Sequence, residues 1–150
     1  MSSSRNDRRL RELEDFVSEL RSGGWKGFER VKLVDEYAEK IGKIIAETGN
    51  NRSQVRGFFD EINAIRAVVE GQEKSGSVDF KSILPIIKLV KAKVAYKASR
   101  RAGSSNIVSE EFKKLMFACI DAIKDLEDFK IFSEFFEAMY AYYYGLARGN

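Results

Sequence analysis

Three aspartates, Asp121, Asp125 and Asp128, have the spacing at which one helix face could present several carboxylates to a metal ion. Residues four and then three positions apart share a helix face, so a single helix through them would group their side chains. No matched ligands accompany them, because the sequence contains no histidine and only one cysteine, Cys119. We interpret the three as a solvated helix face, with Asp128 capping the helix that follows, and predict no metal site.

The sequence also lacks the side chains on which enzymatic catalysis usually depends. Without histidine the chain can form neither a Ser-His nor a Cys-His pair, and it has no imidazole base. No Ser-x-x-Lys sequence occurs, and the glycine-rich residues 23–27 lack the spacing of a phosphate-binding loop. A lone cysteine cannot make an intramolecular disulfide, so Cys119 is expected to be a small buried apolar residue. We predict no catalytic residues, no cofactor and no enzymatic activity.

The first of two segments suited to bind an anion runs from Asn51 to Arg56, at the start of a predicted helix. Backbone amides, the Gln54 side chain and the guanidinium groups of Arg52 and Arg56 would meet there. Helix N-termini and arginines both bind phosphate, so the segment could hold a polyanion. An N-cap with solvated arginines accounts for it equally well.

The second segment ends the most basic part of the chain. Residues 79–102 contain seven basic residues and one acidic residue, whereas the whole chain has a net charge of only +3. Four cations would share an arc of about 100° on a helix: Lys93, Lys97, Arg100 and Arg101. Tyr96 lies among them, where it can stack on a base or pack in the core. The alternative is a solvated face whose charges favour the helix dipole.

These segments need a scaffold, and the pattern of the chain is helical. Glycine-rich joints divide it into five or six segments, in which apolar residues recur every three or four positions. Two such stripes are Phe28, Val31, Val34, Tyr37, Ile41, Ile44 and Ile45, and then Val55, Phe58, Phe59, Ile62, Ile65, Val68 and Val69. No stretch alternates polar and apolar residues for long. We predict an all-α fold, a compact helical bundle of five to six helices.

We expect residues 1–7 to be a disordered N-terminal tail and residues 8–150 to form a single helical domain. Within it, Ser109 followed by two glutamates is typical of an N-cap. Pro85 should lie in the first turn of its helix or kink it, so the regular part of that helix should begin near Ile83. No apolar run is long enough to cross a membrane, and a cytoplasmic location is expected.

Two further stretches suggest contacts with partners. Residues 8–21 form a charged amphipathic helix whose narrow apolar stripe could face another molecule. The C-terminal tract holds more aromatic residues than one core face can bury, and the surplus suggests an interface with another subunit. The tract comprises Phe129, Phe132, Phe135, Phe136, Tyr140, Tyr142, Tyr143 and Tyr144.

Short motifs in three places give the chain a resemblance to a known family. Ser53-Gln54-Val55-Arg56 opens a helix, and later come Lys93, Ala95, Tyr96 and Arg100, followed by Phe135, Phe136, Glu137, Ala138, Ala141 and Tyr142. In order and spacing these resemble the small subunit of the type III-A CRISPR-Cas effector, the Csm complex, over about residues 48–147. Ser99 departs from the pattern, because the family usually has glycine there.

The resemblance implies a non-catalytic RNA-binding scaffold subunit of an antiviral ribonucleoprotein in a bacterial or archaeal cytoplasm. Several copies would associate and stack along the guide RNA and target RNA, contacting mainly the target strand, beside other Csm subunits that cleave. We expect the RNA backbone to be bound without sequence specificity, since cations neutralise phosphates and guide pairing reads the sequence. The candidate RNA-binding residues are Arg52, Gln54, Arg56, Lys93, Lys97, Arg100 and Arg101.

Two alternatives remain open. A helical protein-protein interaction module could dock its basic helix on an acidic partner rather than on RNA. A small DNA-binding regulator could use residues 52–70 as a recognition helix, although Gly57 and the apolar stripe beside it argue for packing instead.

Overall fold

A computed structural model describes residues 2–102 and 105–147. Apart from one short hairpin, its regular elements are helices, which confirms the all-α prediction. Because α2, η2 and α3 follow one another without a break, they count as one helix, and the described residues form six long helical segments. The elements are α1 (Ser2–Gly23), the 3-10 turn η1 (Trp25–Gly27), α2 (Arg30–Lys32), the π-helical turn η2 (Leu33–Tyr37), α3 (Ala38–Ala46), α4 (Arg52–Lys74), α5 (Phe80–Ser99), β1 (Arg101–Ala102), β2 (Ser105–Asn106), α6 (Glu110–Asp121) and α7 (Leu126–Leu146).

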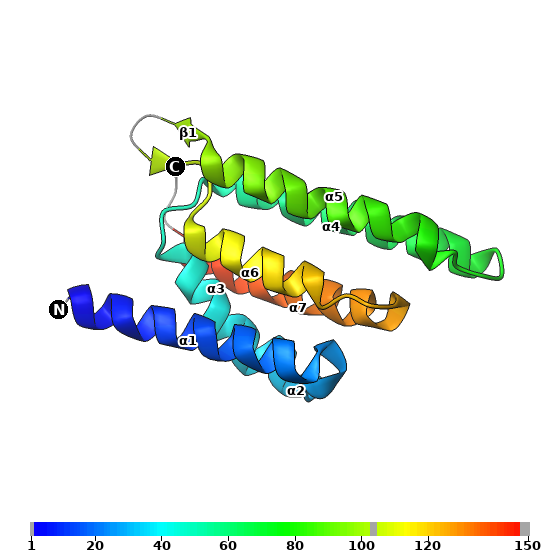
Figure 1. Ribbon diagram of the computed structural model, residues 1–150, viewed down its shortest axis with the longest axis horizontal. Helices are drawn as coiled ribbons and strands as arrows, with labels where there is room; N and C mark the ends of the chain where they lie inside the picture. The colour runs from blue at the N-terminus through cyan, green and yellow to red at the C-terminus, as the bar shows by residue number, and fades with distance from the viewer. Residues whose placement is uncertain (1, 103–104, 148–150) are drawn as a thin grey trace.

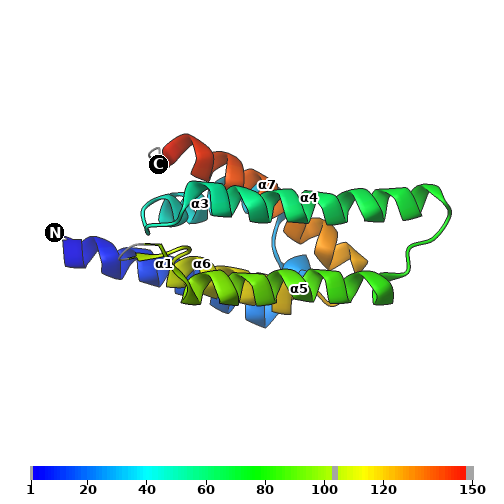
Figure 2. The same cartoon turned by 90° about the horizontal axis from the view of Figure 1, so that it is seen from above.

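The helices form two layers (Figures 1 and 2). In one layer α6 lies between α1 and α5, and in the other α7 lies between α3 and α4. Helices α4 and α5 make a long antiparallel hairpin at the edge of the molecule, so α4 begins at the end where α5 finishes (Figure 2).

An aromatic cluster fills the space between α1, η1 and α7. The Phe16 ring stacks on Phe28 and Phe135 with centroid distances of 5.3 and 5.1 Å. Trp25 is fully buried, and its Nε1 donates a hydrogen bond to the carbonyl of Cys119 at 3.0 Å. This core takes up most of the C-terminal aromatic tract, and Tyr144 is the member of the tract that keeps a largely exposed side chain. The aromatic surplus available to another subunit is therefore smaller than expected.

The N-terminal helix extends further than predicted. Helix α1 begins at Ser2, so residues 2–7 are helical where a disordered tail was expected, and Met1 lies outside the described residues. Arg9 holds this end by donating to the carbonyl and carboxylate oxygens of Glu47, both at 3.3 Å. The apolar stripe of α1 packs on the body of the protein through four buried side chains: Leu13, Phe16, Val17 and Leu20.

The turn η2 shifts the first predicted apolar stripe. A turn of π-helix contains more residues than a turn of α-helix, so the face that meets the core changes across it. Val31 is 72% exposed and Leu33 is buried in its place. The prediction for Val31 was therefore wrong, whereas Ile41 and Ile44 are buried as expected.

The ends of the later helices match the predictions in part. The Ser109 hydroxyl accepts a hydrogen bond from the backbone N–H of Phe112 at 3.0 Å, which confirms it as an N-cap. Helix α7 is capped instead by Asp125, whose carboxylate accepts from the backbone N–H of Asp128 at 2.9 Å. The prediction of Asp128 as the cap was wrong. Helix α5 begins at Phe80 and continues through Pro85.

Candidate nucleic-acid interface

The α4–α5 hairpin brings both predicted anion-binding segments to one end of the molecule (Figure 2). Main-chain hydrogen bonds connect them through one residue. The Asn51 N–H donates to the Ile107 carbonyl at 2.9 Å, and the Ile107 N–H donates to the Arg100 carbonyl at 3.0 Å. We call the five cations gathered here the basic end: Arg52, Arg56, Lys97, Arg100 and Arg101.

The first turn of α4 forms as predicted, but part of its anion-binding capacity is used internally. The Asn51 side chain caps the helix and accepts from the backbone N–H groups of Ser53 and Gln54 at 3.0 and 3.2 Å. Two of the backbone amides expected to meet a phosphate are therefore occupied. The cationic groups of this turn are the guanidinium groups of Arg52 and Arg56, and the Arg56 side chain is 70% exposed.

The last turn of α5 differs from the predicted arc of four cations. The helix ends at Ser99, so Arg100 has extended backbone and Arg101 begins β1, and neither belongs to the helix face. Lys93 pairs with Glu61, with 2.6 Å between Nζ and Oε1. Lys97 is half-buried and makes no ion pair with the residues that the structure describes. Of the two lysines, Lys97 is thus the one whose charge has no acidic partner among the described residues.

The remaining cations of the basic segment are distributed unevenly. Lys88 and Lys91 both approach Asp121 of α6, at 3.7 and 2.6 Å, and so join the two helices. Lys81 lies at the opposite end of the hairpin, in the first turn of α5. The excess positive charge of residues 79–102 is therefore partly neutralised along the middle of α5, and the cations that this segment contributes to the basic end lie at its C-terminal end.

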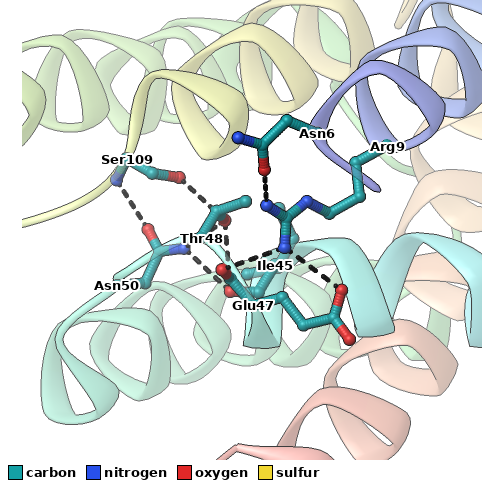
Figure 3. A network of polar contacts seen from close by, with 7 residues as sticks. All are labelled: Asn6, Arg9, Ile45, Glu47, Thr48, Asn50 and Ser109. Carbon is teal, nitrogen blue, oxygen red and sulfur yellow. Dashed lines mark hydrogen bonds and ion pairs between the residues drawn. The ribbon is translucent and has the colours of Figure 1, made fainter. Parts of the chain in front are cut away.

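A polar network positions the loop that precedes α4 (Figure 3). The Asn50 side chain accepts from the Ser109 N–H at 2.7 Å and donates to the Ile45 carbonyl at 3.0 Å. The hydroxyls of Thr48 and Ser109 lie 3.3 Å apart. These contacts tie the loop to the end of α3 and the start of α6, so the first turn of α4 is held by two other helices.

Aromatic rings lie beside the cations, although the sequence predicted such a neighbour only in Tyr96. The Arg100 guanidinium lies over the Tyr96 ring, 5.2 Å from its centroid, and donates to the Tyr96 hydroxyl. The Arg52 guanidinium lies 4.1 Å from the centroid of Tyr144, near the end of α7. The four-residue spacing of Tyr140 and Tyr144 indicates that the two rings share one face of α7. The sequence does not show that this face meets the start of α4, because the two segments are far apart in the chain.

The three aspartates do not share a helix face, so that interpretation was wrong. Asp121 is the last residue of α6, whereas Asp125 and Asp128 both accept from Lys26 Nζ, at 2.6 and 2.9 Å. The hydrogen bond from Lys26 lowers the pKa of Asp125. Among residues 2–102 and 105–147, no three acidic, histidine or cysteine side chains gather in a group that could hold a metal ion. Cys119 is buried as predicted, which raises the pKa of its thiol.

Comparison with known proteins gives one positive result. A protein-family model with the description Csm2 Type III-A matches residues 29–146. No curated protein and no solved structure matches the chain. Within the described residues, no helix combines the length and apolar character needed to cross a membrane.

Proposed function

The chain belongs to the Csm2 family of type III-A CRISPR systems and is a subunit of the Csm complex; on that premise we propose that it is a non-catalytic scaffold whose basic end binds the RNA backbone. The observation that carries the proposal is the gathering of five cations from the start of α4 and the end of α5. Guanidinium and ammonium groups neutralise phosphates whatever the base sequence, so guide pairing would supply the specificity.

The number of cations in one subunit favours a repeated arrangement. Few phosphates can be contacted by five side chains, so the affinity of a single copy for RNA is low. Several copies stacked along the guide and target RNA, in contact with each other and mainly with the target strand, would bind as one multivalent unit. Other Csm subunits would hold the complex together and cleave the target, in the bacterial or archaeal cytoplasm.

The contacts within the hairpin refine which candidate residues bind RNA. Lys93 is engaged with Glu61, and the backbone N–H of Gln54 with Asn51. We therefore assign the main phosphate contacts to the five cations of the basic end, Arg52, Arg56, Lys97, Arg100 and Arg101, with smaller contributions from Lys93 and Gln54.

A fourfold variant tests the assignment: Arg52→Ala, Arg56→Ala, Lys97→Ala and Arg100→Ala together. Its affinity for single-stranded RNA should fall, and the slope of log affinity against log salt should decrease by about 0.7 for each lost phosphate contact. The measurement is a salt titration of the full-length subunit and of the assembled complex.

The matched control removes four exposed lysines from the other end of the molecule: Lys32, Lys74, Lys81 and Lys124. They lie in α2 and at the α4–α5 and α6–α7 turns, away from the basic end (Figure 1). Both variants lose the same formal charge, so equal effects would show that only net charge matters and would refute the assignment.

Docking of the basic end on an acidic protein is the competing function. Photocrosslinking of labelled target RNA in the assembled complex distinguishes the two. Crosslinks to the α4–α5 hairpin support RNA binding, whereas crosslinks confined to other subunits, with unchanged RNA affinity of the fourfold variant, support the protein partner.

A further inference from the structure

An open groove of about 500 Å³ lies between α4 and α7 beside the basic end. Its lining combines rings with charged groups: Arg56, Phe59, Asp60, Tyr140, Ala141 and Tyr144. Four of these six residues come in pairs one helical turn apart, Arg56 with Asp60 on α4 and Tyr140 with Tyr144 on α7. Each helix therefore places one such pair on the face that lines the groove.

Internal contacts hold the rings in place. Tyr140 stacks on Phe59 with a centroid distance of 4.3 Å and an interplanar angle of 11°. Phe59 and Tyr140 are half-buried, whereas the Tyr144 side chain is 52% exposed. The groove thus has a fixed aromatic floor and, in Tyr144, a ring with accessible surface.

Arginines lie beside this aromatic surface. Arg52 covers part of the Tyr144 ring, and Arg56 lines the groove with its Nε 3.9 Å from Asp60 Oδ2. Unpaired RNA bases are commonly bound by stacking on tyrosine or on an arginine plane, with cations on the adjoining phosphates. A carboxylate among the rings adds a hydrogen-bond acceptor for the edge of a base.

We propose that this groove binds one unpaired RNA base, which stacks on Tyr144 while Arg52 and Arg56 contact its flanking phosphates. The inference rests on the proposed function and adds to it a contact with a base. An RNA base fits better than a protein side chain, because Arg56 in the groove and Arg52 beside it both belong to the basic end, so one strand can occupy the two sites.

Asp60 gives the groove a preference among bases. Guanine carries two adjacent N–H donors on its pairing edge, so it can donate twice to one carboxylate, whereas uracil has a single N–H donor. We expect an unpaired guanine to be favoured over uracil, and Asp60→Asn to remove the preference.

The test compares the affinities of the full-length subunit for two single-stranded RNAs of equal length, one intact and one with abasic residues at its centre, at low ionic strength. The phosphates are the same in both, so the ratio of affinities reports contacts with bases alone. We expect the intact RNA to bind about five- to a hundredfold more tightly, the range that stacking of one base on an aromatic side chain implies. Tyr144→Ala should abolish most of this ratio, and Tyr144→Phe, which keeps the ring, should preserve it.

The outcomes separate this inference from the proposed function. Equal binding of the two RNAs by the wild type, or an equal loss for both in Tyr144→Ala, overturns the base site while leaving phosphate binding intact. Loss of other Csm subunits from the Tyr144→Ala complex, with the RNA ratio unchanged, assigns the groove to a protein partner and also overturns it. By contrast, a fourfold basic-end variant that binds both RNAs as the wild type does contradicts the proposed function itself.

Discussion

Around α1, η1 and α7, where the two layers meet, side chains are buried and polar groups have partners. The α4–α5 hairpin at the edge of the molecule instead has a cation without an ion pair among the described residues and apolar side chains that remain exposed. Around η1, Lys26 contacts two carboxylates and Trp25 has both a buried ring and a bonded Nε1. On the hairpin, Lys97 has no ion pair among the described residues, and the apolar side chain of Leu89 is 57% exposed.

We infer from this difference that the side chains which stabilise the fold are largely distinct from those proposed to bind RNA. Buried rings and matched charges stabilise the core around α7, while the free groups of the hairpin are available to other molecules. Substitutions should therefore have separable effects: variants of the buried core should change the free energy of unfolding, and variants of the exposed cations at the end of the hairpin should change RNA affinity.

The largest expected effect follows from Trp25→Ala. Removing the buried indole and its hydrogen bond to Cys119 should lower the free energy of unfolding by about 3–5 kcal/mol. Leu89→Ala on the hairpin is the control, with a change within about 0.5 kcal/mol because its side chain is exposed. Denaturant unfolding followed by circular dichroism measures both, and similar losses in the two variants would disprove the contrast.

A pair of glycines tests the same contrast at the level of the backbone. A Cβ at Gly42 would lie 2.8 Å from the Met139 carbonyl oxygen and 3.1 Å from the Tyr143 nitrogen, so α3 and α7 would have to separate. We expect Gly42→Ala to destabilise the fold by about 1–3 kcal/mol. At Gly57 a Cβ meets nothing within 4 Å, and Gly57→Ala should stabilise α4 by about 0.5–1 kcal/mol. Thermal unfolding of both variants would refute this interpretation if the two shifts had the same sign.

Within the hairpin, Lys97 and Lys93 should differ in their contribution to RNA binding. Lys97→Ala should reduce the salt slope by about 0.7, the value of one phosphate contact to a single strand. Lys93→Ala should reduce it less, because Glu61 already neutralises that lysine. Salt titrations of the two single variants provide the comparison, and an equal reduction would mean that the Glu61 pair opens when RNA binds.

The smallest effect concerns Lys26 and the pH dependence of stability. The folded pKa of Asp125 is lowered by Lys26, so this pair stabilises the fold above the unfolded pKa of about 3.9 and stops doing so as the pH falls through the folded value. Lys26→Met should lower the melting temperature slightly at neutral pH, and the difference from wild type should shrink below about pH 4. Lys32→Met removes an exposed lysine from α2 and should show no such trend; a difference that stayed constant down to pH 3 would contradict the attribution.

Features encoded within one helix were predictable from the sequence. The cap at Ser109 and the buried positions Val55, Phe58 and Ile62 follow from side chains a few residues apart, and the structure confirms them. The turn η2 could not be anticipated, because the exchange of Val31 for Leu33 depends on packing against other helices.

The candidate site was predictable in composition but not in geometry. Both basic segments were found, yet their meeting through Ile107 depends on a contact between distant parts of the chain. The pairing of Lys93 with Glu61 depends on the alignment of α4 with α5, which spacing along one helix does not determine. The packing expected at Gly57 and its neighbours is made by the buried apolar stripe alone, because Gly57 itself faces open space.

The burial of Trp25 makes the protein its own fluorescent reporter of folding. It is the only tryptophan in the sequence, it is fully shielded from water, and η1 lies at the opposite end from the start of α4 (Figure 1). Tryptophan emission should therefore respond to unfolding of the core and stay silent when RNA occupies the basic end. One sample can then report stability through its own emission and binding through a dye on the RNA.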